Sequence, residues 1–237
     1  MNPFDSTIIN FINQFSHVSW TFDFIIKSIS TNNYIKGGFL IILFWWGWFT
    51  AGKRQKDTQI HLLATLFSCV IAIIVARTLA LSLPFRLRPM YESDIGFILP
   101  YFMKMTSMEG WSSFPSDHAV LFYALSTGMF YISKKTGIFA FIYTTLLISF
   151  PRIYLGLHYP TDIIAGACVG ILITSLCNKT ACIENLSRRA GNWADNRPEI
   201  FYPVSFIITY QIVDMFKNSR NLAKFLWLLL DCRDFWN

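Results

Sequence analysis

The chain has 237 residues, of which 54% are hydrophobic and 17% aromatic, while only 14% are charged. Because soluble domains carry about 25% charged residues, this composition excludes an ordinary water-soluble surface, a disordered chain and a coiled coil. The net charge is +6, so the position of the basic residues decides whether a nucleic acid is the partner. The five cysteines form no CxxC pair and three lie in apolar runs, so we expect neither a disulfide framework nor a metal site.

Apolar runs that suit membrane helices follow one another along the chain. The run 6–22 lacks charged residues but holds several amides, so it fits a membrane helix or an interfacial helix. The clearest span is 61–83, with Arg77 as its only formal charge. Several later runs have about 15 residues, below the roughly 20 of a usual span, and flanking loops can supply the missing turns. The other candidates are 34–51, 119–133, 137–150, 163–177 and the ambiguous 199–216.

We therefore predict an all-α, polytopic membrane protein, a helical bundle with about six core transmembrane helices. Residues 1–33 are expected to form an N-terminal interfacial or transmembrane helix. Residues 34–178 are expected to form the membrane core. Residues 179–237 are expected to form a basic cytoplasmic loop followed by a C-terminal hydrophobic segment.

Basic residues occupy every second loop between these runs, as expected of cytoplasmic loops. The alternate loops, 84–117 and 151–162, then lie on the outer face. This distribution explains the basic balance without a nucleic acid. The cytoplasmic positions are Lys53, Arg54 and Lys56 in one loop, Lys134 and Lys135 in another, and Lys179, Arg188, Arg189 and Arg197 after the last core run.

The two outer loops contain nearly all the residues that can do chemistry. They hold three clusters: Arg-Leu-Arg-Pro at 86–89, Phe-Pro-Ser-Asp-His at 114–118, and a third at 152–162. Converging arginines suit a phosphate, because guanidinium donates in a planar, bidentate manner. Ser116 and Asp117 are predicted to begin a helix whose N-terminus favours an anion.

Two histidines can divide the work of phosphoryl transfer at such a phosphate site. One histidine attacks phosphorus and the other protonates the leaving oxygen. His158 is followed four residues later by Asp162, and Pro160 suits a first helical position between them. The turn can bring Asp162 back to the His158 ring, which fixes the tautomer and supports a positive charge.

These clusters resemble the three-part signature of the type-2 phosphatidic acid phosphatase family: Lys-x6-Arg-Pro, Pro-Ser-Gly-His and Ser-Arg-x5-His-x3-Asp. The blocks occur in the same order over a core of about 37–177. The resemblance implies His158 as nucleophile, Asp162 as its partner and His118 as general acid. The phosphate ligands that it implies are Arg88, Arg152, Ser116 and the backbone N–H of Asp117.

The sequence departs from the family pattern at three positions. The lysine of the first block falls on Leu81, the glycine of the second block is Asp117, and the serine of the third block is Pro151. Leucine cannot bind phosphate. Arg77, one helical turn earlier, or Arg86, in the following loop, is expected to supply the missing cation.

The resemblance implies hydrolysis of a lipid-linked phosphate or pyrophosphate through a phosphohistidine intermediate, with no metal or other cofactor. Because the Pro-Ser-Asp-His block and the small size resemble bacterial undecaprenyl-pyrophosphate phosphatases, undecaprenyl pyrophosphate is the expected substrate. We expect a protein of the bacterial cytoplasmic membrane with an outward-facing site, whose partners are lipid phosphate and bilayer. The alternatives are a lipid phosphoryltransferase and a non-catalytic lipid-binding or transport member of the family.

Overall fold

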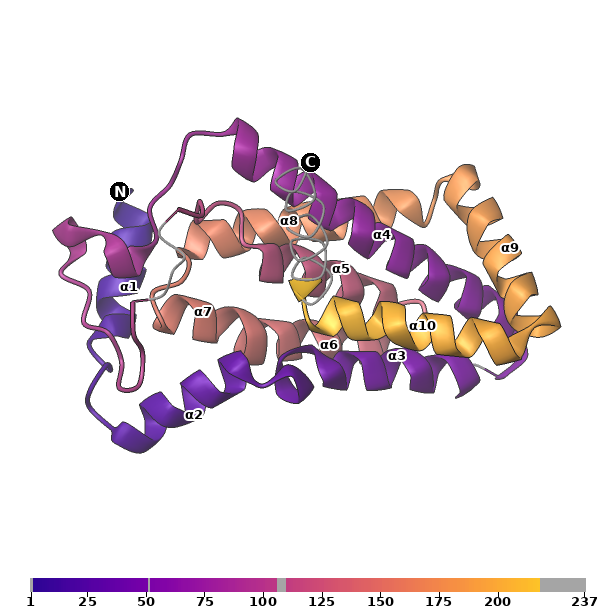
Figure 1. The fold of residues 1–237 in the computed structure, drawn as a ribbon, viewed down its shortest axis with the longest axis horizontal. Helices are drawn as coiled ribbons and strands as arrows, with labels where there is room; N and C mark the ends of the chain where they lie inside the picture. Colours follow the sequence, from indigo (N-terminus) through magenta and orange to yellow (C-terminus); the bar gives the residue numbers. More distant parts are fainter. Residues whose placement is uncertain (1, 51, 106–109, 218–237) are drawn as a thin grey trace, which may run out of the picture.

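The computed structural model describes residues 2–50, 52–105 and 110–217, and the regular elements in these ranges are all helical (Figure 1). The predicted all-α fold is thus confirmed. The main helices are α1 (Pro3–Asn13), α2 (Trp20–Thr31), α3 (Phe39–Thr50), α4 (Gln55–Ser82), α5 (Asp117–Met129), α6 (Lys134–Tyr143), α7 (Phe150–Tyr154), α8 (Pro160–Cys177), α9 (Ala181–Asn196) and α10 (Pro198–Val213).

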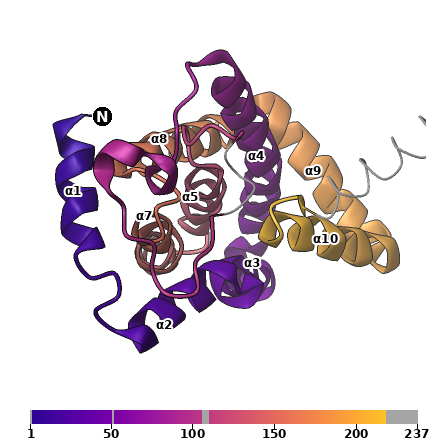
Figure 2. The same ribbon diagram turned by 60° about the vertical axis from the view of Figure 1, so that its left-hand side comes forward.

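Helix α5 lies at the centre of the bundle (Figure 2), where it contacts α3, α4, α6 and α8. Its side chains are apolar around almost the whole circumference and nearly all are buried, as expected of a helix enclosed by others. Gly166 and Gly170 let α8 approach α5 closely. A Cβ atom at Gly170 would lie 2.3 Å from the Val120 carbonyl oxygen. Small residues allow this contact between membrane helices.

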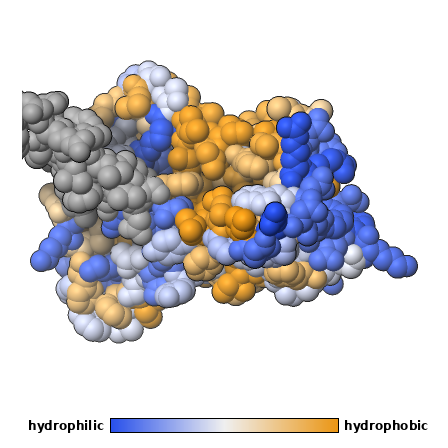
Figure 3. Space-filling view, turned by 45° about the vertical axis from the view of Figure 1, so that its right-hand side comes forward, coloured by the Kyte–Doolittle hydropathy of each residue, from blue (hydrophilic) through white to orange (hydrophobic). Residues whose placement is uncertain are grey.

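Three continuous helical segments are long and apolar enough to cross a membrane within the described part of the chain: Gly52–Ser82, Lys134–Tyr154 and Pro160–Cys177. An apolar band covers the middle of the visible face, and hydrophilic residues gather at the end where α9 lies (Figure 3). This surface fits the predicted membrane protein. Helices α3 and α5 have only 12 and 13 residues, so the count of about six crossings stays a prediction.

The N-terminal segment differs from the single helix expected over 6–22. Helix α1 ends at Asn13 and α2 begins at Trp20. Between them, His17 adopts a left-handed backbone conformation with a φ of 66°, and the Ser19 hydroxyl caps α2 by accepting from Phe22 N–H. An 11-residue helix is about 16 Å long, about half of a bilayer core. The segment 6–22 is therefore divided between two shorter helices, and an interfacial position of this part of the chain stays a prediction.

The second outer loop is shorter than the predicted 151–162. Helix α6, the π-helix η5 (Thr144–Ser149) and α7 form one continuous rod that ends at Tyr154. Pro151 does not end this rod, because proline fits the first turn of α7. Arg152 therefore lies on a helix, and 155–159 alone form the connection to α8.

The C-terminal part contains α9 and α10, which approximate the predicted basic loop and hydrophobic segment. Helix α10 covers most of 199–216 but ends at Val213. The rest of the predicted segment from residue 218 onwards lies outside the described residues. The α3–α4, α5–α6 and α8–α9 connections share one end of the bundle, and the loop before α5 and the α7–α8 connection share the other (Figure 1). This arrangement agrees with the predicted alternation of basic and chemistry-bearing loops.

Candidate active site

Backbone hydrogen bonds join the loops that carry the three sequence clusters. Ser113 N–H donates to the Arg86 carbonyl at 2.8 Å, and Met90 N–H donates to the Gly156 carbonyl at 3.0 Å. Ser116 N–H donates to the Asp162 carbonyl at 3.2 Å. The clusters are far apart in sequence, yet these bonds hold them at one end of α5 and α8, as predicted.

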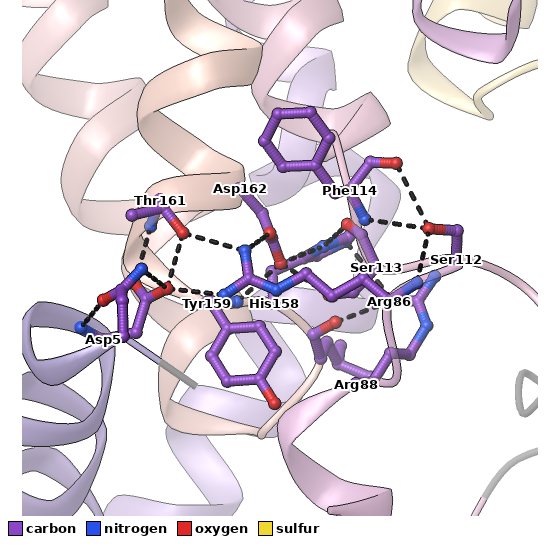
Figure 4. Close-up of polar contacts among 12 residues, drawn as sticks. Asp5, Arg86, Arg88, Ser112, Ser113, Phe114, His158, Tyr159, Thr161 and Asp162 are labelled. Carbon is purple, nitrogen blue, oxygen red and sulfur yellow. Dashed lines mark hydrogen bonds and ion pairs between the residues drawn. The ribbon is translucent and has the colours of Figure 1, made fainter. Parts of the chain in front are cut away.

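His158 lies buried in the centre of the convergent loops (Figure 4). Its Nδ1 atom is 2.8 Å from the Ser113 carbonyl oxygen. Because a carbonyl only accepts, the proton of a neutral ring is on Nδ1. The other nitrogen, Nε2, carries the lone pair and lies 3.4 Å from an Arg88 guanidinium nitrogen. The ring is therefore set for nucleophilic attack from Nε2, toward a site that favours an anion.

Asp162 is fully buried at the start of α8, and its position differs in one respect from the sequence expectation. Its Oδ2 atom is 3.6 Å from His158 Nδ1, beyond hydrogen-bond distance, because the Ser113 carbonyl occupies the place beside Nδ1. The carboxylate accepts from the Ser113 hydroxyl at 2.5 Å and from the Tyr159 N–H at 2.8 Å. Asp162 thus acts on His158 by its charge and by holding Ser113.

The environment of His158 favours the neutral ring. Burial lowers the pKa of the His158 imidazole below its usual value, the Asp162 carboxylate opposes this effect, and the Arg88 and Arg152 guanidinium groups add to it. Neutral imidazole is the nucleophilic form, so the burial that lowers the pKa extends its reactive range toward acid pH.

His118 lies in the first turn of α5, and its Nε2 atom is 2.7 Å from an Arg152 nitrogen. Since arginine only donates, Nε2 accepts and a neutral His118 carries its proton on Nδ1. The Arg152 charge disfavours a second proton on the ring. An anion bound to Arg152 would reduce this effect and favour the imidazolium, as the acid role requires.

The protein provides acceptors for only some of the hydrogen-bond donors of Arg88 and Arg152. Arg88 donates to the Leu157 carbonyl at 2.7 Å, and Arg152 donates to the Ser30 carbonyl at 3.1 Å. Within the described residues, the buried Nε atoms of both arginines have no hydrogen-bond partner. Burial lowers the pKa of Arg88 from its usual value. Two buried guanidinium groups with donors to spare are the expected lining of a phosphate site.

Ser116 caps the helix that carries His118. Its side chain is fully buried and accepts from Ala119 N–H at 3.5 Å. Asp117 follows at the first helical position, so its backbone N–H belongs to the first turn of α5. The hydroxyl is thus placed to hold the helix end, and the predicted phosphate contact from Ser116 requires this cap to be exchanged or shared.

The two arginines expected to replace the family lysine contact carboxylates instead. Arg77 forms an ion pair with Asp117 and lies over the Trp111 ring, 4.6 Å from its centroid. Arg86 donates to two carboxylates and stacks on Tyr159. The Leu81 side chain is 87% exposed, so it points out of the bundle. Both positively charged groups at this end of α4 therefore have anionic partners within the protein.

Sequence reasoning missed three residues of this site. Ser113 orients His158 and Asp162, and its place two residues before the Pro-Ser-Asp-His block was the available signal. Lys36, in the π-helix η1 (Tyr34–Gly38), is 9% exposed, and its charge acts on both His118 and Arg152. A lone lysine in an apolar run was the signal for it.

The third missed residue is Asp5, in the first turn of α1, which is fully buried and bonded to Arg86. Sequence gave no reason to join a carboxylate near the N-terminus to clusters more than 80 residues away. The spacing of the residues around Asp5 gives no indication that this carboxylate is buried.

Comparison with known proteins gives a family match over half of the chain. A family model described as the PAP2 superfamily matches residues 61–181, which include the positions of all three clusters. Both α1 and α2 lie outside this match.

Three curated proteins illustrate the range of relatives. The Bacitracin transport permease protein BcrC of Bacillus licheniformis is 39% identical over 74 residues, 31% of this chain and 36% of that protein. The Undecaprenyl-diphosphatase BcrC of Bacillus subtilis is 31% identical over 103 residues, 44% of this chain and 49% of that protein. The Lipid A 1-diphosphate synthase of Escherichia coli is 28% identical over 183 residues, 72% of this chain and 73% of that protein. The matches therefore span between about a third and three quarters of these proteins.

Proposed function

Because the chain belongs to the PAP2 superfamily, we propose that it is a membrane phosphatase that hydrolyses a lipid-linked phosphate or pyrophosphate through a phosphohistidine intermediate. The observation that carries this proposal is the geometry of His158. A carbonyl oxygen at 2.8 Å from Nδ1 leaves the Nε2 lone pair 3.4 Å from the Arg88 guanidinium. A phosphoryl group held by Arg88 would lie within reach of that lone pair.

The proposed reaction has two steps. His158 Nε2 attacks phosphorus, the bond from phosphorus to the leaving oxygen breaks, and protonated His118 gives its proton to that oxygen. Water then attacks the phosphohistidine, with His118 acting as base, and releases phosphate. During attack the His158 ring becomes positive, and the nearby Asp162 carboxylate stabilises that charge.

Phosphate binding is assigned to Arg88, Arg152, Lys36 and the N-terminus of α5. Two arginines have buried Nε atoms that lack protein partners among the described residues. Lys36 adds a third buried charge that acts on the Arg152 and His118 end of the site. Lys36 therefore replaces the family lysine in our proposal, in place of Arg77 and Arg86.

Undecaprenyl pyrophosphate is the proposed substrate. The chain is similar to a protein named as an undecaprenyl-diphosphatase, and it has the Pro-Ser-Asp-His block of such bacterial enzymes. The proposed place is the bacterial cytoplasmic membrane, with the site facing outward, which rests on the alternation of basic loops.

A lipid phosphoryltransferase is the second candidate function. It is favoured by a relative matched over 183 residues, which is named as a Lipid A 1-diphosphate synthase. The same site serves both reactions up to the phosphohistidine, and the second acceptor, water or lipid phosphate, decides between them.

The deciding experiment measures the fate of the phosphoryl group. Purified protein in detergent is given undecaprenyl pyrophosphate, phosphatidic acid, phosphatidylglycerol phosphate or lipid A phosphate, with and without lipid A as acceptor. Release of inorganic phosphate independent of lipid A supports the phosphatase, and labelled phosphate on lipid A supports the transferase. No turnover of any lipid, with retained binding, would refute both and favour a non-catalytic member. The matched control is His158→Ala.

The orientation of the site is tested separately in intact cells without native cysteines. Glu92→Cys lies in the outer loop and is expected to react with a membrane-impermeant thiol reagent. Lys134→Cys, at the other end of the bundle, is expected to react only after permeabilisation. The reversed pattern would contradict an outward-facing site.

A further inference from the structure

Helix α1 contributes a carboxylate to the candidate active site. Asp5 is completely buried, although it is the third residue of a helix at the rim of the bundle (Figure 2). Its Oδ1 atom accepts from Thr161 N–H at 3.0 Å, and its Oδ2 atom accepts from the Thr161 hydroxyl at 2.6 Å. A buried carboxylate is costly unless it is paired and hydrogen-bonded, so this contact fixes α1 to the start of α8.

The positive partner of Asp5 is Arg86, which lies between two carboxylates (Figure 4). One terminal nitrogen of Arg86 is 2.6 Å from Asp5 Oδ2, and the other is 2.6 Å from Asp162 Oδ1. The guanidinium plane also lies over the Tyr159 ring, 4.0 Å from its centroid. Because guanidinium is a rigid planar fork, the position of Asp5 constrains the position of Arg86 and so that of Asp162.

Charge balance gives Asp5 a second effect. Arg86 and Asp162 alone form a neutral pair, which would do little to stabilise a positive charge on His158. With Asp5 included, the group of three carries a net charge of −1. Asp5 thus offsets the charge of Arg86, so that the negative charge of Asp162 is felt at the His158 ring, 3.6 Å away.

We propose that Asp5 is a positioning residue of the active site, which holds Arg86 and preserves the negative field of Asp162 at the attacking histidine. The inference rests on the proposed function of His158. It extends the site beyond the segment matched by the family model, which begins at residue 61. Helix α1 then completes the site in addition to its packing on the bundle.

The test compares variants that change the charge of this group by different amounts. Asp5→Asn leaves a neutral group, and Asp5→Asn combined with Arg86→Gln restores a net charge of −1. Thr161→Val is the matched control, since it removes hydrogen bonds to Asp5 and Arg86 but leaves all three charges. The readouts are kcat and KM for phosphate release, the pH profile of kcat/KM and the Tm in detergent. The acid limb of that profile is the pH range in which kcat/KM falls because His158 becomes protonated.

Asp5→Asn is expected to lower kcat by about 10- to 100-fold, the scale of one charged hydrogen bond, with little change in KM. Its acid limb moves to lower pH, because the negative charge that favours a protonated His158 is offset. The double variant is expected to regain the acid limb of the wild-type enzyme, and Thr161→Val is expected to keep it. The other charged or titratable groups that face His158, which are Arg88, Arg152 and His118, are unchanged in these variants.

Two results would overturn the inference in an active enzyme: a wild-type kcat and acid limb in Asp5→Asn, or a double variant whose limb stays with that of Asp5→Asn. If Asp5→Asn does not fold, the double variant decides alone, by a limb at the wild-type pH or displaced from it. In this variant Asp162 still accepts hydrogen bonds from the Ser113 hydroxyl and the Tyr159 N–H. A wild-type protein that turns over no lipid phosphate would instead overturn the proposed function, and this inference with it.

Discussion

The close contact between α5 and α8 makes a testable link between helix packing and catalysis. In Gly170→Ala, the new Cβ would lie 2.3 Å from the Val120 carbonyl oxygen and 2.9 Å from the Ala124 nitrogen. Both atoms belong to the α5 backbone and cannot rotate away. Ordinary contacts begin at 3.4 Å, so the helices must move apart by about 1 Å at this point.

This movement separates the two sides of the site, because α5 carries His118 and α8 carries Asp162. A misplacement of about 1 Å at reacting groups costs about 100-fold in rate, so we expect Gly170→Ala to lower kcat/KM by about that factor. Overpacking of this kind also costs about 1–3 kcal/mol in stability. The assay is phosphate release from a lipid substrate, together with Tm, for protein that elutes as a single species in detergent.

Gly191→Ala is the matched control, since a Cβ atom there meets nothing within 4 Å. It is expected to retain the wild-type kcat/KM. Wild-type kcat/KM in folded Gly170→Ala protein would refute the reasoning. A lower Tm with unchanged kcat/KM would show that the α5–α8 distance sets stability but does not set the geometry of the site.

Three further predictions concern the chemistry. His158→Ala is expected to be inactive on every substrate. His118→Ala is expected to lose far more activity on phosphatidic acid than on nitrophenyl phosphate, because the leaving group of nitrophenyl phosphate needs less protonation. Equal losses of activity on both substrates would contradict the division of roles. The acid limb of kcat/KM is expected at a lower pH than the usual pKa of an imidazole, since burial lowers the pKa of His158. Asp162→Asn removes the charge that raises this pKa, so the limb is expected to move further down. A limb that moves upward in pH titrations of this variant would contradict the assignment. Lys36→Met is expected to lower kcat/KM by about 100-fold, the scale of a lost transition-state charge contact, while Leu81→Ala keeps the wild-type value because that side chain is exposed; a fully active Lys36→Met enzyme would return the role to another cation.

The part of the site that could be predicted from sequence is the part joined by short spacing and by topology. His158 and Asp162 are four residues apart across a proline-initiated helix, and the order of the helices places His118 at the same end. The family match supports this recognition. The length and apolar character of the runs also predicted the all-helical class, because each long apolar run needs a helix to satisfy its backbone in a membrane.

The remaining features depend on three-dimensional contacts that leave no local pattern. The backbone carbonyl of Ser113 replaces a side chain as the partner of His158 Nδ1, and any residue type has such a carbonyl. Arg77 and Arg86 were candidates for a phosphate contact because their charge is visible in the sequence. Their carboxylate partners, Asp117 and Asp5, became apparent only from the packing.

The ion group of Asp5, Arg86 and Asp162 also constrains the order of events during synthesis. Its members are separated by 81 and 76 positions, so the first carboxylate leaves the ribosome long before the last. Until α8 is made, Asp5 lacks both the Thr161 donors and the arrangement that fixes Arg86. A carboxylate without these partners favours water over a bilayer or a protein interior. We therefore expect α1 to stay at the aqueous boundary of the membrane until α8 is made, and to dock late in the maturation of the protein.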